Sequence, residues 1–168
     1  AYLVHQHPWA QIGIYYSKST RLFYRSKPEE GDSFEGSVKG MIAVLNENHI
    51  PFDFVADDDL DIDNLSKYRL IVLSNTRCMS EHECEIIEAY VRNGGALLAT
   101  YASSLYTENG DMRKDFGLSR VFGCSFGGEK WNTRKDHYQH IIEAIHPVVH
   151  KLSEHSELLI NAGYSLLT

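Results

Sequence analysis

The sequence has 168 residues, of which 43% are hydrophobic and 23% charged, and its formal net charge is −7 at pH 7. This length and composition allow one globular domain with a hydrophobic core of its own. A negative net charge repels a phosphate backbone, so the sequence predicts no nucleic-acid binding, and no apolar run reaches the ~20 residues that a membrane span needs.

The domain organisation is predicted to be simple. Residues 1–9 show no periodic pattern and are expected to be a linker, followed by a single α/β domain over residues 10–168. The chain starts at Ala1 and ends on an apolar stretch, so we expect it to be part of a longer polypeptide. Three cysteines are too few, and odd in number, for a disulfide framework. The sequence does not indicate a cellular compartment.

Four short apolar runs predict strands, with room for helical segments between them. One of them, residues 69–74, is hydrophobic at almost every position, which is typical of a central parallel strand buried on both faces. Strand–helix–strand units of this length form right-handed crossovers. The sequence therefore predicts a three-layer α/β fold, with a mainly parallel sheet and helices on both faces. The expected strands are residues 11–16, 51–55, 69–74 and 96–101.

Two helices are indicated by the residues at their ends. Hydrophobic residues recur at helical spacing from Phe34 onward, and Asp32 is expected to cap the start of this helix. Ser80 and Glu83 have the spacing of a capping box, which predicts the start of a second helix. The Asn-Gly-Gly at residues 93–95 is typical of a helix C-terminus.

The pattern weakens after Tyr101. Residues 116–122 are expected to form a short helix, and the glycine-rich residues 123–131 to be irregular. Residues 138–142 are expected to form a late strand, and residues 147–152 a helical turn.

Several segments resemble the motifs of one family. Residues 65–74 (LSKYRLIVLS) resemble its "L-x-x-Y-k-l-v-v-l-P" strand, and residues 90–101 (YVRNGGALLATY) resemble its "Y-V-x-x-G-G-x-l-v-x-T-y". Residues 49–53 (HIPFD) and 108–110 (ENG) resemble its "n-I-P-v-D" and "D-E-N-G". In this order and spacing, over roughly residues 10–125, the chain resembles the β-galactosidase trimerisation domain of the class I glutamine-amidotransferase-like superfamily.

This resemblance implies a flavodoxin-like or glutamine-amidotransferase-like fold and no catalysis by the domain. In such glycosidases the catalytic carboxylates lie in a separate barrel domain, and the amidotransferase-like domain packs between subunits. The resemblance therefore implies other domains of the same polypeptide and further copies of the protein as partners. It implies no cofactor.

The turn after the strand at 96–101 is where an amidotransferase carries its nucleophile. A working enzyme needs an activated cysteine there, on a tight turn flanked by glycines. Here the turn is Tyr101-Ala102-Ser103-Ser104, which has neither. Glutaminase activity is therefore not expected. A serine hydrolase that pairs Ser103 or Ser104 with His137 or His140 is an alternative.

Two clusters in the sequence contain residue types that bind metals. Asp59, Asp61 and Asp63 imitate the start of a calcium-binding loop, but Leu70 stands where that loop needs a bidentate glutamate. His146 and His150 are four residues apart, but a proline follows His146 and is expected to start a helix there. The sequence therefore predicts a solvated acidic loop and no metal site.

The segment from Ser17 to about Asp32 is predicted to be a long loop at the carboxyl end of the first strand. Ligands and partners of open α/β sheets bind at that end, and arginine and aromatic residues are enriched in interface cores. We therefore expect a subunit or inter-domain contact, with a mobile insertion as the alternative. The candidate contact residues are Arg21, Phe23, Tyr24 and Arg25.

Three functions remain open at this stage. The first is a structural and oligomerisation module of a larger, carbohydrate-active protein. The second is a sugar- or small-molecule-binding module on the same fold, in which Trp9, Trp131 and the tyrosines offer stacking surfaces. The third is the serine hydrolase described above.

Overall fold

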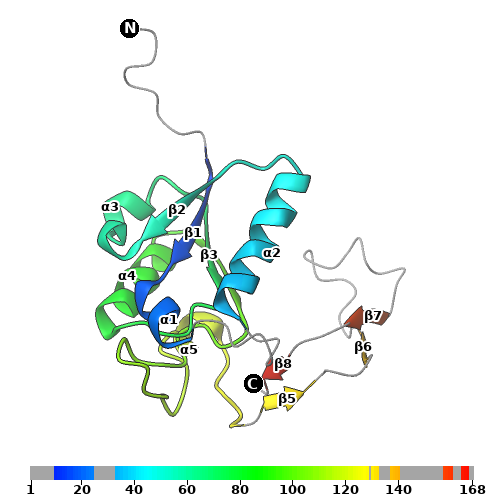
Figure 1. Ribbon diagram of the computed structural model, residues 1–168. Helices are drawn as coiled ribbons and strands as arrows, with labels where there is room; N and C mark the ends of the chain where they lie inside the picture. The colour runs from blue at the N-terminus through cyan, green and yellow to red at the C-terminus, as the bar shows by residue number, and fades with distance from the viewer. Residues whose placement is uncertain are drawn as a thin grey trace, which may run out of the picture.

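The computed structural model describes residues 10–24 and 33–128, and beyond them four short strands at residues 130–132, 137–140, 157–160 and 164–166. Its centre is a four-stranded sheet in the order β2-β1-β3-β4, in which every pairing is parallel (Figure 1). The strands are β1 (Ile12–Tyr16), β2 (Phe52–Ala56), β3 (Leu70–Ser74) and β4 (Ala96–Thr100).

Helices cover both faces of this sheet (Figure 1). On one face, α2 (Phe34–Glu47) packs its buried residues against β1 and β3. On the other face, α3 (Ile62–Leu65), α4 (Glu81–Arg92) and α5 (Ser119–Phe122) enclose a second hydrophobic cluster. Residues on β3 contribute to both clusters, as expected for a strand buried on both sides. The three-layer α/β fold predicted from the sequence is confirmed.

The predicted strands and the second predicted helix are confirmed within one residue at their boundaries. Ser80 Oγ accepts the Glu83 N–H at 3.2 Å, and Glu83 Oε2 accepts the Ser80 N–H at 2.5 Å, so the capping box is present. Helix α4 ends at Arg92 with Asn93 as its C-cap, and Gly94 follows with φ of 95°. A residue with a Cβ is strained at this angle, which accounts for the glycine.

The predicted loop after β1 is wrong in its first part, where α1 (Lys18–Phe23) forms. Ser17 caps this helix by accepting the Thr20 N–H at 3.0 Å. Thr20 is buried, and its hydroxyl accepts the Cys78 N–H at 2.9 Å. A helix of six residues with one buried position has no hydrophobic periodicity, so the sequence pattern did not reveal it.

The predicted cap of α2 is also shifted by one residue. Ser33 is the N-cap, and its Oγ accepts the Gly36 N–H at 2.7 Å. Asp32 lies outside the described residues. The cap is the residue directly before the first helical residue, and α2 begins at Phe34.

The region after β4 differs from the prediction in two places. Helix α5 is shorter than the predicted 116–122, because Gly117 and Leu118 donate their N–H groups to Ser104 and not to a preceding helical turn. The predicted irregular segment 123–131 overlaps a strand, β5 (Lys130–Asn132), and the predicted strand at 138–142 is β6 (His137–His140).

Two antiparallel pairs that the sequence did not predict involve these strands. β5 pairs with β8 (Tyr164–Leu166), and β6 pairs with β7 (Glu157–Ile160). The predicted helical turn at 147–152 lies outside the described residues. In the part of the chain that is described, none of the helices has the length and apolar character to span a membrane.

Candidate functional site at the carboxyl edge of the sheet

The strand order places a switch point between β1 and β3, the position where open α/β sheets bind ligands at the carboxyl ends of their strands. The first turn after β3 leads to α4, and the turn after β4 leads to the loop that carries residues 105–117. Helix α1 leaves β1 at the same edge. The chemistry of this edge depends on which side chains these three connections bring together.

An arginine fills the space between the connections. Arg77 is only 5% exposed, and its guanidinium carbon lies 4.8 Å from the ring centre of Tyr24 and 5.3 Å from that of Tyr101. Its Nε donates a hydrogen bond to Asn75 Oδ1 at 3.2 Å. Cation–π contacts of this kind are worth about 0.5–2 kcal/mol each. The arginine and two tyrosines therefore join α1, β3 and β4 where a ligand would enter other proteins of this architecture.

The turn after β4 has the backbone of a tight elbow but no accessible nucleophile. Tyr101 and Ser104 have φ of 52° and 63°, in the left-handed region. Ser103 Oγ accepts the Thr76 N–H at 3.1 Å and lies 3.0 Å from the carbonyl oxygen of Leu73. Ser103 is buried, so its hydroxyl holds the two turns together.

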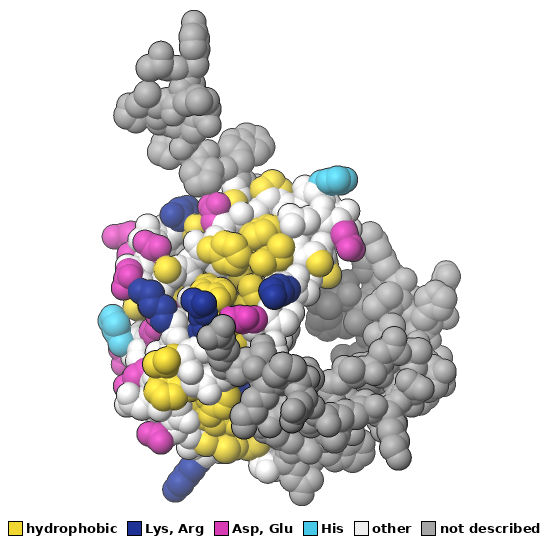
Figure 2. Space-filling model, in the orientation of Figure 1, with side chains coloured by type: hydrophobic (Ala, Val, Ile, Leu, Met, Phe, Trp, Pro, Cys, Tyr) yellow, Lys and Arg dark blue, Asp and Glu magenta, His cyan; other side chains and the backbone are white. Residues whose placement is uncertain are grey.

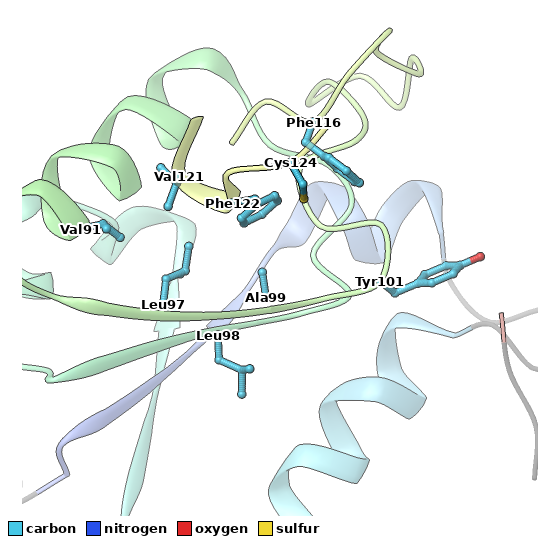
Figure 3. A pocket seen from close by; sticks show the side chains of 9 residues that line it. All are labelled: Val91, Leu97, Leu98, Ala99, Tyr101, Phe116, Val121, Phe122 and Cys124. Carbon is cyan, nitrogen blue, oxygen red and sulfur yellow. The ribbon is translucent and has the colours of Figure 1, made fainter. Parts of the chain in front are cut away.

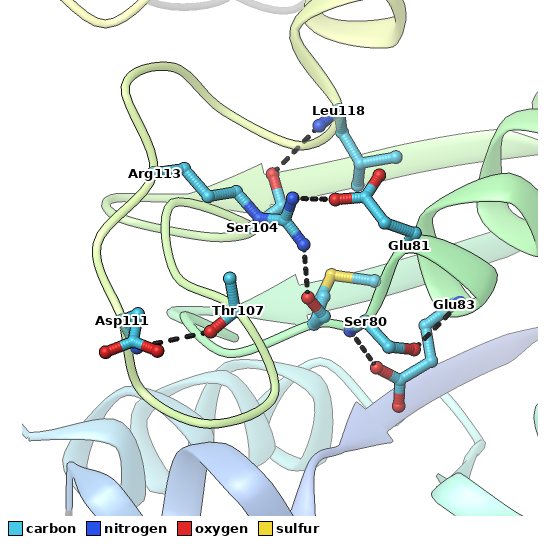
Figure 4. A network of polar contacts seen from close by, with 9 residues as sticks. Ser80, Glu81, Glu83, Ser104, Thr107, Asp111, Arg113 and Leu118 are labelled. Carbon is cyan, nitrogen blue, oxygen red and sulfur yellow. Dashed lines mark hydrogen bonds and ion pairs between the residues drawn. The ribbon is translucent and has the colours of Figure 1, made fainter.

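Ser104 also has a structural role, because its buried hydroxyl binds the backbone. The residue is fully buried, and its Oγ accepts the Leu118 N–H at 3.1 Å (Figure 4). Its carbonyl oxygen accepts the Gly117 N–H at 2.8 Å. Ala102 is buried beside it. The side chains of His137 and His140, the proposed bases of a serine hydrolase, lie outside the described part of the structure. Both serine hydroxyls are therefore closed off from solvent and engaged in backbone contacts.

A second polar cross-link holds the loop after β4 against the start of α4 (Figure 4). Arg113 forms an ion pair with Glu81, and its Nη2 donates to the carbonyl oxygen of Met79 at 2.8 Å. The Glu81 side chain is largely exposed, but the Arg113 side chain is mostly buried. This cross-link was not predicted, because it joins residues 32 positions apart.

Of the four predicted contact residues, the structure describes three, of which two are exposed and one packs into the fold. Arg21 points outward, with a side chain 55% exposed and 3.6 Å from Glu35. Phe23 is half-exposed and lies against Gly110. Tyr24 instead packs inward, where its ring centre is 4.7 Å from that of Tyr106. Arg25 lies outside the described residues.

The acidic segment Asp57–Asp63 is held by hydrogen bonds to β1 and α1 and by the cap of α3. Asp57 and Glu83 lie 2.9 and 2.5 Å from the buried Tyr15 hydroxyl. Burial, followed by the charges of Glu83 and Asp57, raises the pKa of Tyr15. Asp61 caps α3, and the Asn64 N–H lowers the pKa of Asp61. The predicted solvated character agrees with the exposure of Asp58, Asp59, Asp61 and Asp63. The predicted loop is wrong in its backbone, because the segment forms a 3-10 turn and the start of α3.

One hollow lies beside β4, which is one of the two edge strands of the four-stranded sheet. Its volume is about 480 Å³, and its lining is mostly hydrophobic, with Leu97 and Ala99 on one side of β4 and Leu98 on the other (Figure 3). Sites for polar ligands have several convergent hydrogen-bonding groups. The residues that the structure describes in this lining are mostly hydrophobic, so they do not favour the sugar-binding alternative. The side chains of Trp9 and Trp131, offered as stacking surfaces, lie outside the described residues.

The three cysteines are free thiols with different surroundings. Burial raises the pKa of Cys78 to about 11 and that of Cys84 to about 12, whereas Cys124 is partly exposed. The thiolate is the reactive form, so a raised pKa and burial both slow alkylation. We expect one fast-reacting thiol with a disulfide reagent at pH 8, and three thiols after denaturation. A Cys124→Ser variant should have no fast thiol; two fast thiols in the unmutated chain would contradict the buried positions.

Comparison with known proteins agrees with this architecture. The sequence matches the family described as the beta-galactosidase trimerisation domain over residues 10–151, further than the 10–125 expected from the motifs. No curated protein sequence matches the chain.

Solved structures share the fold. The GH42 β-galactosidase Gan42B from G. stearothermophilus superposes with a TM-score of 0.68 and 18% identity, over 94% of this chain and 22% of its own. A β-galactosidase from Bifidobacterium adolescentis superposes with a TM-score of 0.57 and 15% identity, over 69% of this chain and 54% of its own. A ThuA-like protein from Bacteroides uniformis superposes with a TM-score of 0.62 and 18% identity, over 97% of this chain and 64% of its own.

The chain therefore spans about half of the length of one of these β-galactosidases and about a fifth of the other. At these identities the superpositions establish the fold alone. The family match covers most of the chain, and this protein belongs to the β-galactosidase trimerisation domain family.

Proposed function

We propose that this chain is a non-catalytic structural domain that holds together an oligomer of a larger, glycoside hydrolase-like protein. The observation that carries the proposal is the closed carboxyl edge of the sheet. Arg77 occupies the crevice between Tyr24 and Tyr101, and the hydroxyls of Ser103 and Ser104 are buried in backbone contacts. A site that is filled by its own side chains offers neither a nucleophile nor room for substrate.

The partners in this proposal are other domains of the same polypeptide and further copies of it. Membership of the β-galactosidase trimerisation domain family and the shared fold with two β-galactosidases support a carbohydrate-active parent protein. Residues 1–9 serve in this proposal as a linker, and residues 10–168 as one domain.

The contact surface in this proposal includes the outward residues of α1. Arg21 and Phe23 are exposed, and so is Leu22, which the sequence analysis did not single out. Tyr24 is better regarded as part of the fold, because its hydroxyl donates to the carbonyl oxygen of Gly110 at 3.2 Å. A test of the surface should therefore leave Tyr24 unchanged.

The test of the proposed function is the mass of the 168-residue chain in solution. Light scattering over a range of concentrations is expected to give a mass larger than that of a single chain. The mass should fall on dilution, since association depends on concentration. A single-chain mass at every concentration would contradict the proposal.

A further inference from the structure

One tyrosine hydroxyl at the end of β1 faces two carboxylates. Tyr15 is fully buried, and its hydroxyl oxygen lies 2.9 Å from Asp57 Oδ1 and 2.5 Å from Glu83 Oε1. Asp57 begins the 3-10 turn after β2, and Glu83 lies in the first turn of α4. We call these three side chains the Tyr15 cluster. The cluster joins three elements that are far apart in the sequence.

The number of protons in the Tyr15 cluster decides how strongly it holds these elements. A phenol has one proton, and an ionised carboxylate has none to donate. Burial, followed by the charges of Glu83 and Asp57, raises the pKa of Tyr15, so the hydroxyl keeps its proton at neutral pH. That proton can be donated to one of the two carboxylates. The second oxygen–oxygen contact is therefore a hydrogen bond only when the cluster holds a second proton.

Both carboxylates are fixed in place by the backbone. Asp57 Oδ2 accepts the Lys18 N–H at 3.1 Å, and Glu83 Oε2 accepts the Ser80 N–H at 2.5 Å (Figure 4). Neither carboxylate can turn away from the Tyr15 hydroxyl without losing its backbone partner. Two ionised carboxylates held in this way repel each other, and a proton shared between them removes the repulsion.

The surroundings of the cluster on the side of the 3-10 turn are mostly acidic. In Figure 2 several acidic side chains lie along the left margin, on the side where Figure 1 shows α3. The one cation from α1, Lys18, places its Nζ 2.6 Å from Asp58 Oδ2 and is therefore paired outside the cluster. A negative surrounding favours the uptake of a proton. The exposed carboxylates that follow Asp57 in this segment are Asp58, Asp59, Asp61 and Asp63.

The side of α4 adds no cation near Glu83 among the described contacts. Glu81 is a further carboxylate in the first turn of α4, and it pairs with Arg113. Two thiols also face Glu83, and burial raises the pKa of Cys78 to about 11 and that of Cys84 to about 12. Both thiols are therefore neutral wherever the carboxylates titrate, and they do not compete with the cluster for its proton.

We propose that the Tyr15 cluster is a pH-dependent cross-link, in which the folded chain holds one proton between Asp57 and Glu83 that the unfolded chain does not hold. With this proton bound, two hydrogen bonds join β1 to the turn after β2 and to α4. Without it, one hydrogen bond remains and two charges face each other. Coupled groups of this kind titrate as a unit, so the proton belongs to the cluster.

The sign of the pH dependence follows from proton counting. Where the folded state binds more protons than the unfolded state, the stability of the fold decreases as the pH rises. The contribution of the Tyr15 cluster is complete below about pH 4, where unfolded carboxyl groups also bind protons. It is lost as the pH rises through the value at which the folded cluster releases its proton.

Glu83→Gln tests the proposal because an amide carries the second proton at every pH. Its amide oxygen can accept the Ser80 N–H, since glutamine also forms capping boxes, and its amide N–H can donate to the Tyr15 hydroxyl. Urea unfolding of this variant and of the unmutated chain is compared from about pH 5 to 9 at one protein concentration. The unfolding equilibrium constant of the unmutated chain, divided by that of the variant, should rise by up to about tenfold for each pH unit over which the proton leaves.

A second variant and a control accompany this measurement. Asp57→Asn should give the same result, because its amide can accept the Lys18 N–H and donate to the Tyr15 hydroxyl. The matched control is Glu35→Gln. Glu35 lies in the first turn of α2, as Glu83 does in α4, but it lies 3.6 Å from Arg21. The control should show the pH dependence of the unmutated chain, because the histidines and other carboxylates are the same in both.

Each outcome decides for or against the cross-link. A ratio that rises with pH for the amide variants and stays level for the control supports it. A response in only one amide variant also supports it and places the proton on that carboxylate. Level ratios for both amide variants overturn the proposal, and so do ratios that fall as the pH rises, since the folded state would then favour two ionised carboxylates.

Discussion

Replacing Gly95 with alanine is expected to destabilise the domain by about 3 kcal/mol. A Cβ at this position would lie 2.2 Å from Cζ of Tyr90 and 2.4 Å from both of its Cε atoms. The Tyr90 ring is buried, and its hydroxyl donates to the carbonyl oxygen of Tyr68 at 3.1 Å. The ring must therefore move, which disrupts packing on α4 and the hydrogen bond together.

Urea or thermal unfolding measures this effect, and a loss of about 3 kcal/mol corresponds to roughly 6–12 °C in melting temperature for a domain of this size. The matched control is Gly40→Ala in the middle of α2, where a Cβ meets no atom within 4 Å. That variant should gain about 0.5–1 kcal/mol, because alanine restricts the unfolded chain and favours helix.

A double variant tests the cause of the Gly95 effect. If the Tyr90 ring is the obstacle, Tyr90→Leu with Gly95→Ala should be much less destabilised than the sum of the two single changes. Additive losses, or a loss below ~1 kcal/mol for Gly95→Ala alone, would contradict the close approach of Gly95 to the ring.

Replacing Arg77 with alanine is expected to cost about 3 kcal/mol. The change removes two cation–π contacts, one to Tyr24 and one to Tyr101, and the hydrogen bond to Asn75. It also leaves a cavity at the carboxyl edge, since Arg77 is buried. Because Tyr24 ends α1, the loss should loosen that helix first.

The measurement is again unfolding, supplemented by near-ultraviolet circular dichroism, which reports on the packing of tyrosines. Arg77→Lys should recover part of the stability, since a lysine keeps the charge but not the planar stacking group. Arg92→Ala is the control, because Arg92 is 69% exposed and pairs with Glu88 on α4, and exposed ion pairs contribute only about 0–1 kcal/mol. Equal effects at Arg77 and Arg92 would show that the crevice is not filled as described.

The motif Tyr90-Val91-x-x-Gly94-Gly95 illustrates how far sequence reasoning reached. It correctly predicted a helix end followed by a strand, because capping preferences act within a few residues. The structure adds why both glycines are needed: Gly94 has a positive φ, and Gly95 makes room for the Tyr90 ring.

The candidate site was predicted only in part. The turn after β4 was located correctly, and its lack of cysteine was plain from the sequence. The burial of its two serine hydroxyls was not evident from the sequence, because Ser103 and Ser104 accept hydrogen bonds from Thr76 and Leu118, which are distant in the chain. Arg77 was missed altogether, since no local pattern indicates an arginine between two tyrosines from other connections.

Local patterns were therefore sufficient for the strands, the capping box and the α/β class, because hydrophobic periodicity and capping depend on neighbouring residues. Family membership also followed from short motifs in order. Helix α1 and the contacts of Arg77 with Tyr24 and Tyr101 needed the folded chain. They arise where segments far apart in sequence meet at the carboxyl edge of the sheet, and their stability comes from packing that no single segment encodes.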